Sequence, residues 1–500
     1  MRSATTRSAD RTLSRTRARA AILATCALAL TACTAGPDFV RPQAPAAARY
    51  TAEQLQVESG GQSDSLQHIA PGREIEGNWW TLFRSAAIDS IVKEALEHNR
   101  NLAAATATLA QAQELAAAQA GSRFPQIGVT AAAGRQKYGE EFLGGLAPPF
   151  TFTYYSIGPT VSYTLDLSGG VARSVEGKYA EAEVARRRMD AAYLTITGEA
   201  VLQTLAIAST QAQISTLETL IGQDRDNLKL VQTAFDNGSV ARLDVLAAQS
   251  QLIEDMTLLP PLRQDLAKAH HALSVLLGRV AADRLPPDVA LDEITLPLEL
   301  PVTLPSELVH RRPDILAAEA QLHVATSAVG VAASNLYPQI QLSATAALES
   351  LQPEHLFDRA NAAWSLLSGV TQPIFDGGTL RAEKRATVDA MRASAANYEQ
   401  TVLEAFAQVA DMLESLDHDA EELDAQTQAE QGAAGRLALV RTSYAEGNSG
   451  VIQVLDAERT YQRARTGYVR AVAQRYLDTV QLFLALGGTN PNQAAAPHAG

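Results

Sequence analysis

The sequence predicts a mixed, mainly α-helical fold that is internally duplicated and contains a few short strands. The duplication is visible in the Phe-Pro-Gln-Ile segment at 124–127, which returns as Tyr-Pro-Gln-Ile at 337–340. Between these landmarks run long tracts that are rich in alanine and poor in proline, and two pairs of segments in which apolar and polar residues alternate. Two long copies of one unit indicate a pseudo-symmetric architecture whose units cannot bury their apolar faces alone.

The N-terminus has the features of an export signal. Its first residues are rich in arginine, and the apolar stretch from Ala20 to Leu30 is too short to span a bilayer. The following Leu30-Thr31-Ala32-Cys33 resembles the lipobox of bacterial lipoproteins, which implies cleavage before Cys33 and acylation of that cysteine. The alternative is an ordinary secretory signal followed by an unrelated cysteine. We expect a lipoprotein signal peptide at 1–32, lipidation at Cys33, and no disulfide in a mature chain with one cysteine.

The mature chain is strongly acidic. The whole sequence has a formal net charge of −14, and removal of the basic signal makes the remainder more acidic still. An acidic protein repels nucleic acid, and no basic run with interleaved aromatic residues offsets this repulsion. We therefore expect no nucleic-acid partner.

The signal, the repeats and the composition together predict the boundaries of the parts. They are a signal peptide (1–32), a lipidated extended segment (33–77), a first repeat of helix, β-hairpin, long helix and helix (78–278), a linker or equatorial segment (279–304), a second repeat (305–488) and a flexible tail (489–500).

Two of the tracts have the spacing of a coiled coil. From Gly170 to about Phe235 no proline interrupts the chain, and apolar residues recur every three or four positions. The same spacing holds from Val402 to Leu423. This is the period of long coiled-coil helices, not of short globular ones. An uninterrupted tract of roughly 65 residues would be about 100 Å long.

Four segments alternate with the period of β-strands, at about 124–138, 151–166, 337–349 and 362–375. In the second, Tyr155, Ile157 and Val161 alternate with polar residues such as Thr160. Segments of this length suit tilted transmembrane strands. The alternative is a hairpin of a soluble protein with one solvent-exposed face. The expected lipid anchor, the neighbouring tyrosines and Trp364 favour the membrane.

A membrane location would require several chains. Four strands cannot close into a barrel, and an open edge leaves backbone groups unsatisfied in hydrocarbon. Two chains would supply eight strands, whose interior fills with side chains, whereas three would supply twelve and leave a lumen. We therefore expect a homotrimer that shares one 12-stranded transmembrane β-barrel.

Several motifs, in order along the chain, resemble those of the TolC-type outer-membrane factors, and within them the OprM/NodT-like lipoprotein branch. The resemblance extends from Cys33 to about Gly487. The matching segments are Gly-Pro-Asp-Phe-Val-Arg-Pro at 36–42, Trp79-Trp80 with Phe83, Asn-Arg-Asn-Leu at 99–102, Arg-Pro-Asp-Ile at 312–315 with Glu319, the two Pro-Gln-Ile segments, Phe-Asp-Gly-Gly at 375–378, Tyr444 with Gly447, and Val-Leu-Asp-Ala at 454–457.

The resemblance implies a trimeric duct, with the β-barrel in the outer membrane of a Gram-negative bacterium and an α-helical coiled-coil barrel extending into the periplasm. It implies the outer-membrane channel of a tripartite efflux system, a passive exit for drugs or toxic compounds. The implied partners are a periplasmic adaptor (membrane-fusion) protein and a proton-driven inner-membrane pump of the RND type. Two alternatives remain, an envelope-spanning structural coiled-coil lipoprotein and a type I protein-secretion duct.

The resemblance also implies where the adaptor docks and where the duct closes. The adaptor-binding helix tips would be Asn237, Gly238, Ser239 and Val240 in the first repeat and Glu446, Gly447, Asn448 and Ser449 in the second. Structural turns between helices would contain the same glycines, since glycine supplies the positive φ that ends a helix.

The gate or lumen ring would comprise Asp456, Asp244, Tyr444, Arg459 and Gln453. Asp456 matches an acidic position that would form a ring of three carboxylates in a trimer. Gln453 and Ser449 depart from the charged residues that some members carry at these positions. Asp456 also has an alternative partner in Arg459, three residues further along the same helix.

The sequence offers no recognisable catalytic site. It lacks a phosphate-binding Gly-x-x-x-x-Gly-Lys loop, a His-Glu-x-x-His pair and a Gly-x-Ser-x-Gly turn. His270-His271 and His418-Asp419 are the only clusters that resemble metal ligands, and solvated helix faces explain them better than sites that lack a third ligand. We expect no enzymatic activity, no metal, and no cofactor apart from the covalent lipid on Cys33.

Overall fold

The computed structural model describes residues 34–43, 45, 47, 49–51, 67–73, 75, 77–139, 150–283 and 288–488. The signal peptide, Cys33 and the tail at 489–500 lie outside the described residues. The chain forms two compact units. Unit 1 comprises Met1–Arg41, Ala110–Val184 and Glu319–Asn397, and unit 2 comprises Pro42–Leu109, Ala185–Ala318 and Tyr398–Gly500.

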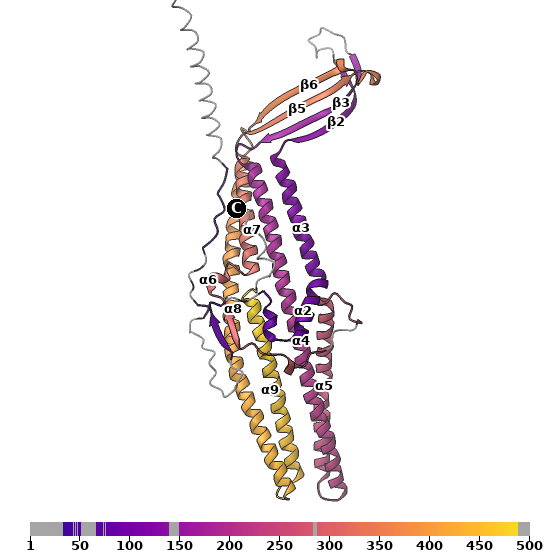
Figure 1. Cartoon of the computed structure of the whole chain (residues 1–500), viewed down its shortest axis with the longest axis vertical. Helices are drawn as coiled ribbons and strands as arrows, with labels where there is room; N and C mark the ends of the chain where they lie inside the picture. The colour runs from indigo at the N-terminus through magenta and orange to yellow at the C-terminus, as the bar shows by residue number, and fades with distance from the viewer. Residues whose placement is uncertain are drawn as a thin grey trace, which may run out of the picture. The chain divides into compact units, whose positions relative to one another are not determined.

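The long elements confirm the duplication (Figure 1). Helix α4 (Gly170–Asp236) and helix α8 (Thr379–Ala445) each have 67 residues. Each is followed by a 35-residue helix, α5 (Arg242–Leu276) or α9 (Val451–Ala485). The α4–α5 pair is called the first hairpin below, and the α8–α9 pair the second hairpin. Equal lengths in both halves are what a repeated unit predicts.

Unit 1 contains one antiparallel sheet of four strands in the order β2-β3-β5-β6. The strands are β2 (Gln126–Tyr138), β3 (Phe150–Leu165), β5 (Gln339–Ser350) and β6 (Ala362–Thr371). The predicted ends of two strands are wrong, since β2 begins after Pro125 and β6 ends before Pro373. Proline has no N–H for the ladder, which accounts for both limits.

Shorter helices lead into and out of the strands. They are α2 (Ala86–His98), α3 (Arg100–Ala120), η2 (Gly121–Arg123), α6 (Pro305–Leu308), α7 (Pro313–Ser334), η4 (Pro353–His355) and η5 (Arg359–Asn361). By length and hydropathy, α4 and α7 contain windows that could cross a bilayer, but half of each window is buried inside the protein. Burial of this kind is typical of helices that pack in a protein core.

The main hydrophobic core lies in unit 2. Trp79 and Phe83 of η1 (Trp79–Phe83) are almost fully buried and pack against Phe483 of α9. Beside them, β1 (His68–Pro71) pairs in parallel with β4 (Glu299–Val302), which follows η3 (Leu291–Glu293). The N-terminal extended segment, the start of the first repeat and the segment between the repeats therefore join one core.

The predicted coiled-coil spacing is confirmed in α8. Val402, Val409, Leu413, Leu416 and Ala420 are all buried. These residues recur at intervals of three, four and seven, so they form one continuous stripe on the helix. The stripe explains why a 67-residue helix persists, since helices of this length gain most of their stability from packing.

Candidate functional site

The strand register gives the sheet of unit 1 two chemically distinct faces. On one face lie Ile127 and Val129 of β2, Ile157, Val161 and Tyr163 of β3, Ile340, Leu342 and Ala344 of β5, and Trp364, Leu366 and Val370 of β6. We call this the apolar face. The other, hydrophilic face carries Gln126 and Thr130, Thr160 and Ser162, Ser343 and Thr345, and Ser365. The alternation predicted for single strands thus coincides across all four.

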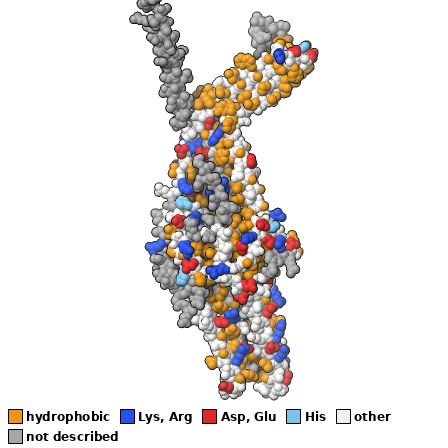
Figure 2. Space-filling view, viewed as in Figure 1, with side chains coloured by type: hydrophobic (Ala, Val, Ile, Leu, Met, Phe, Trp, Pro, Cys, Tyr) orange, Lys and Arg blue, Asp and Glu red, His pale blue; other side chains and the backbone are white. Residues whose placement is uncertain are grey.

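The apolar face is exposed in the single chain. Ile127 and Val129 on one edge strand, and Trp364, Leu366 and Val370 on the other, are each at least 65% exposed. Figure 2 shows hydrophobic side chains spread over the sheet. An apolar surface of this extent indicates contact with lipid or with another protein.

Both edges of the sheet lack a partner among the described residues. Strand β2 pairs only with β3, and β6 pairs only with β5. Each edge strand therefore presents a row of backbone N–H and C=O groups that can pair with another chain.

The two helical hairpins end in nearly identical turns in unit 2. At the first tip Gly238 has φ +74°, and the N–H of Ser239 donates to the carbonyl of Ala234 at 2.8 Å. At the second tip Gly447 has φ +78°, and the N–H of Asn448 donates to Ser443 at 2.8 Å. The structure therefore places the predicted tip residues in the two turns. Asn237, Gly238, Ser239, Glu446, Gly447 and Asn448 are exposed, whereas Val240 and Ser449 are half-buried.

Two of the predicted gate residues cap helices. The carboxylate of Asp244 accepts the N–H of Ala241 at 2.9 Å, and the side-chain oxygen of Gln453 accepts the N–H of Gly450. They occupy equivalent positions at the starts of α5 and α9. Each satisfies a backbone donor that the first turn of a helix leaves unpaired. This local role accounts for both side chains.

Asp456 does not pair with Arg459, so that alternative is wrong. Its carboxylate accepts Nη2 of Arg436, on the neighbouring helix α8, at 2.6 Å. Arg459 instead donates to Gln251 of α5 at 3.0 Å. The i+3 spacing allowed the pair, but the two side chains reach different neighbouring helices. Tyr444 lies half-exposed next to the second tip.

The Asp456–Arg436 pair joins the two helices of the second hairpin near its tip. Both side chains are about half exposed, at 54% and 49%. A second pair, Arg441 with Glu458 at 2.6 Å, joins the same helices. These partners could not be predicted from the sequence, because Arg436 and Asp456 are 20 positions apart with a turn between them.

Each hairpin also contains a buried pair of carboxylic acids that sequence reasoning missed. In the first hairpin Asp224 of α4 faces Asp255 of α5, and each is 5% exposed. Burial, together with the adjacent Asp255, raises the pKa of Asp224 to about 7. Burial and the neighbouring carboxylate therefore favour the protonated form of Asp224 near neutral pH.

The second pair, Asp419 of α8 and Asp478 of α9, lies beside a buried cation. Burial and the neighbouring Asp478 raise the pKa of Asp419 to about 8. Arg475 is 2% exposed, and its Nη1 donates to the carbonyl of Leu416 at 3.3 Å. His418 is solvent-exposed, as predicted, but its neighbour Asp419 turns its carboxylate inward. Among the described residues, no three potential ligands converge as a metal site would require.

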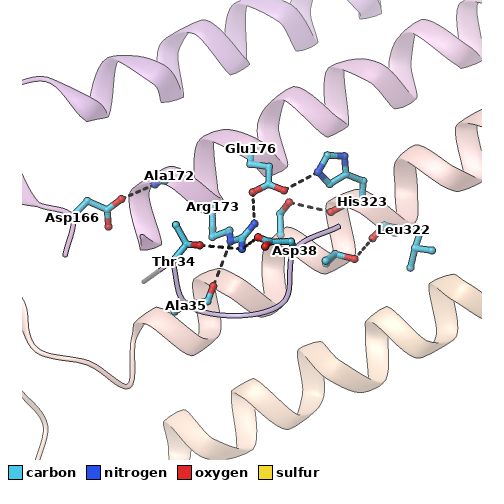
Figure 3. Close-up of polar contacts among 11 residues, drawn as sticks. Thr34, Ala35, Asp38, Asp166, Ala172, Arg173, Glu176, Leu322 and His323 are labelled. Atoms are coloured by element: carbon cyan, nitrogen blue, oxygen red, sulfur yellow. Dashed lines mark hydrogen bonds and ion pairs between the residues drawn. The ribbon is translucent and has the colours of Figure 1, made fainter. Parts of the chain in front are cut away.

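The residues that follow Cys33 form a strap (Thr34–Arg41) that is fixed to unit 1. Arg173 of α4 is 5% exposed and binds the strap through the carboxylate of Asp38, Oγ1 of Thr34 and the carbonyl of Ala35 (Figure 3). At the end of the strap, Nε of Arg41 donates to Glu319 at 2.7 Å.

A second layer of contacts holds Arg173 in place. Glu176 accepts Nη1 of Arg173 at 2.8 Å and contacts His323 at 2.8 Å (Figure 3). Although burial opposes it, these two bonds hold the pKa of Glu176 below its usual range. The ring of His323 also stacks on Phe39 of the strap, with ring centroids 4.3 Å apart.

Glycine makes this close fit possible. Gly36 has φ +87°, and a Cβ there would lie 2.5 Å from the Cα of Gly330. A Cβ at Gly330 would lie 2.7 Å from Arg173. The strap therefore lies on the backbone of α7 at a distance that side chains at either position would prevent.

Comparison with known proteins identifies relatives along most of the chain. The family described as "Outer membrane efflux protein" matches residues 91–279 and 304–488. The pyoverdine export outer membrane protein OpmQ of Pseudomonas aeruginosa is 30% identical over 84% of this chain and 90% of its own length. The toluene efflux pump outer membrane protein TtgF of Pseudomonas putida is 28% identical over 94% of this chain and 97% of its own. The solved outer-membrane channel OprN superposes with a TM-score of 0.81 at 28% identity, covering 91% of this chain and 99% of OprN.

Proposed function

The chain belongs to the outer membrane efflux protein family and is an outer-membrane component of a tripartite efflux system, and from this premise we propose that three copies of it form a passive exit duct. The observation that carries the proposal is the two-faced sheet with two unpaired edges. In a bilayer such edges must be closed, because lipid offers no hydrogen-bond partners.

Closure by three copies accounts for both edges and both faces. Strand β6 of one copy would pair with β2 of the next, which gives twelve strands from three chains. The apolar face would then contact lipid, and the hydrophilic face would line the lumen. Eight strands from two copies would fill the interior with side chains, and a duct needs the lumen.

The two hairpins of each copy would form the periplasmic coiled-coil barrel. Their exposed tips, Asn237–Val240 and Glu446–Ser449, would contact a periplasmic adaptor, which would connect the duct to a proton-driven inner-membrane pump. The relatives OpmQ and TtgF are named for pyoverdine and toluene. We propose small toxic molecules as cargo, with selection by the pump, because a conduit needs no shaped pocket for its cargo.

The alternatives fit less well. A structural coiled-coil lipoprotein has no use for a sheet with one lipid-compatible and one hydrophilic face. A type I protein-secretion duct has the same architecture, but the similar proteins are named for efflux or export of small molecules and cations. These relatives are channel proteins, and we propose that this chain likewise catalyses no reaction and uses no metal or cofactor.

The proposal is tested with protein extracted in detergent from outer membranes. The duct predicts heat-resistant trimers with a strong β-sheet signal, and ion conductance in planar bilayers without an energy source. A deletion strain should become sensitive to compounds that the wild type exports. A monomer without conductance would contradict the duct and favour the structural lipoprotein.

We also propose that Cys33 carries the lipid anchor. Cys33 lies outside the described residues, but Thr34 directly after it is bound by Arg173, so the strap begins immediately after the acylation site. Replacing Cys33 by Ser should abolish incorporation of labelled palmitate. Persistent labelling in this variant would refute the site, since no other cysteine remains in the mature chain.

We propose that Asp456 forms the charged ring of the closed duct. Three carboxylates near one axis would attract divalent cations. Asp456→Asn should therefore weaken block of the conductance by divalent cations. Arg436→Gln should strengthen that block, because it frees the carboxylate from its partner. An exposed pair of this kind contributes about 0–1 kcal/mol to stability, so trimers should remain intact in both variants.

The control for this experiment is Asp389→Asn, which removes a comparable exposed pair with Arg392 elsewhere on α8. It should leave the block unchanged. Equal block in the wild type, Asp456→Asn and Arg436→Gln would assign this ion pair to hairpin structure alone.

A further inference from the structure

Four aromatic rings form a continuous stack at one end of the β2–β3 hairpin. The ring of Tyr138 lies 5.7 Å from Phe150 and 5.5 Å from Phe152, and Phe152 lies 6.1 Å from Tyr154. The register places all four on the hydrophilic face, with Tyr138 opposite Phe150 and Gly134 opposite Tyr154. Transmembrane barrels usually carry their aromatic girdles on the lipid side, so lipid contact does not explain this stack.

A cavity of about 890 Å³ opens beside the stack in unit 1. Its aromatic lining residues are Phe152 and Tyr154 from the hydrophilic face and Tyr155 from the apolar face. Gln136 of β2 and Glu349 of β5 line it as well, and the register pairs Glu349 with Ser156. The segment between β5 and β6 forms the remaining side, where His355 binds Asp358 at 3.0 Å and Asn361 donates to the carbonyl of His355 at 2.7 Å. Ligand cavities in proteins are typically about 300–1,000 Å³, so this space suits a small organic molecule.

The charges around the cavity favour cations. Its acidic lining groups are Glu349 and Asp358, and neither lysine nor arginine lines it. Within the described chain Glu349 has no ion-pair partner, whereas Asp358 is paired with His355. The basic residues of β2, Arg135 and Lys137, fall on the apolar face by the register, and Arg359 of η5 does not line the cavity.

Aromatic rings and an unpaired carboxylate in one cavity are the chemistry that recognises organic cations. A cation over an aromatic ring gains roughly 0.5–2 kcal/mol, and more when water is excluded. A carboxylate adds attraction without a preference for a particular cation. We infer that this cavity is a binding site for hydrophobic organic cations. The inference rests on the proposed duct, in which the hydrophilic face lines the lumen.

The test uses full-length protein in planar bilayers, with tetraphenylphosphonium as the probe and tetraphenylborate as an anion of the same shape. Tetraphenylphosphonium should block the wild-type conductance, and tetraphenylborate should not. Phe152→Leu and Tyr154→Leu, which keep an apolar side chain but remove the ring, should each raise the half-blocking concentration about tenfold, the equivalent of one lost cation–π contact. Glu349→Gln should do the same without changing any packed side chain.

The control variant is Ser162→Ala, on the hydrophilic face but outside the cavity, and its block should equal that of the wild type. Equal block by both probes, or unchanged block in Glu349→Gln together with the two leucine variants, would overturn the cation site while leaving the duct in place. A wild-type protein that forms no conducting pore would instead refute the duct, and the inference with it.

Discussion

Val161→Arg is expected to prevent assembly of the proposed trimer in the outer membrane, whereas Thr160→Arg, one residue earlier, should be tolerated. Val161 lies between Ile127 and Ala344 on the apolar face. An arginine that faces lipid near the bilayer midplane costs about 2 to 4 kcal/mol. The cost would occur three times in a trimer, which is enough to prevent closure of a barrel.

Thr160 is the matched control because it differs from Val161 only in the face that it occupies. It lies between Gly128 and Thr345 on the hydrophilic face, where a long cationic side chain can extend into water. Trimer content of outer membranes, measured on unheated gels, separates the two variants. Equal effects of both substitutions would mean that the sheet does not have one lipid face and one lumen face.

Arg475→Met is expected to lower the free energy of opening the second hairpin by about 3–5 kcal/mol. This is the usual effect of removing one partner from a buried set of charges. Arg475 is 2% exposed and faces Asp419 and Asp417, which oppose the lowering of its pKa by burial. Without it, the Asp419–Asp478 pair has no buried cation beside it. Hydrogen exchange of the amides in α8 and α9 measures the opening free energy directly.

Arg470→Met provides the comparison, since Arg470 is exposed on the same helix and its loss should change the opening free energy little. If Arg475→Met and Arg470→Met have the same small effect, the buried arginine is not required for the hairpin.

The same pair gives the second hairpin a defined pH dependence. The folded hairpin raises the pKa of Asp419 from 3.8 to about 8, so between these values it binds a proton that the unfolded chain does not. Stability from this proton on Asp419 is therefore fully present below pH 3.8 and is lost as the pH rises to about 8. The Asp419→Asn variant has no carboxyl group at this position, so its opening free energy should no longer fall as the pH rises.

The helix period and the strand alternation are local properties, and they predicted the elements well. Alternation identified the two faces of β3 because Val161 and Thr160 are neighbours in sequence. Pro125 and Pro373 lie just outside β2 and β6, and the missing N–H of proline affects the pairing of neighbouring residues only. The features that could be predicted from the sequence are those that depend on residues only a few positions apart.

The parts that could not be predicted depend on contacts between distant segments. Nothing near Asp456 in the sequence points to Arg436, and the nearer Arg459 gave a wrong alternative. Asp419 follows an exposed histidine in a charged stretch, yet its carboxylate faces the partner helix. Arg173 lies in no recognisable sequence motif, yet it binds residues of the strap that precede it by more than 130 positions in the sequence.

The contacts of the strap leave only a short free length of backbone between the folded protein and any lipid on Cys33. The N–H of Ala35 donates to the carbonyl of Ser168 at 2.8 Å, so the chain is already fixed two residues after the cysteine that is proposed to be acylated. Successive Cα atoms are about 3.8 Å apart, which limits the free length of backbone to a few ångströms. A lipid on so short a connection does more than keep the protein at a membrane. It would also set the height of unit 1 relative to the leaflet that holds the acyl chains, and so would determine how deeply the proposed transmembrane sheet could insert.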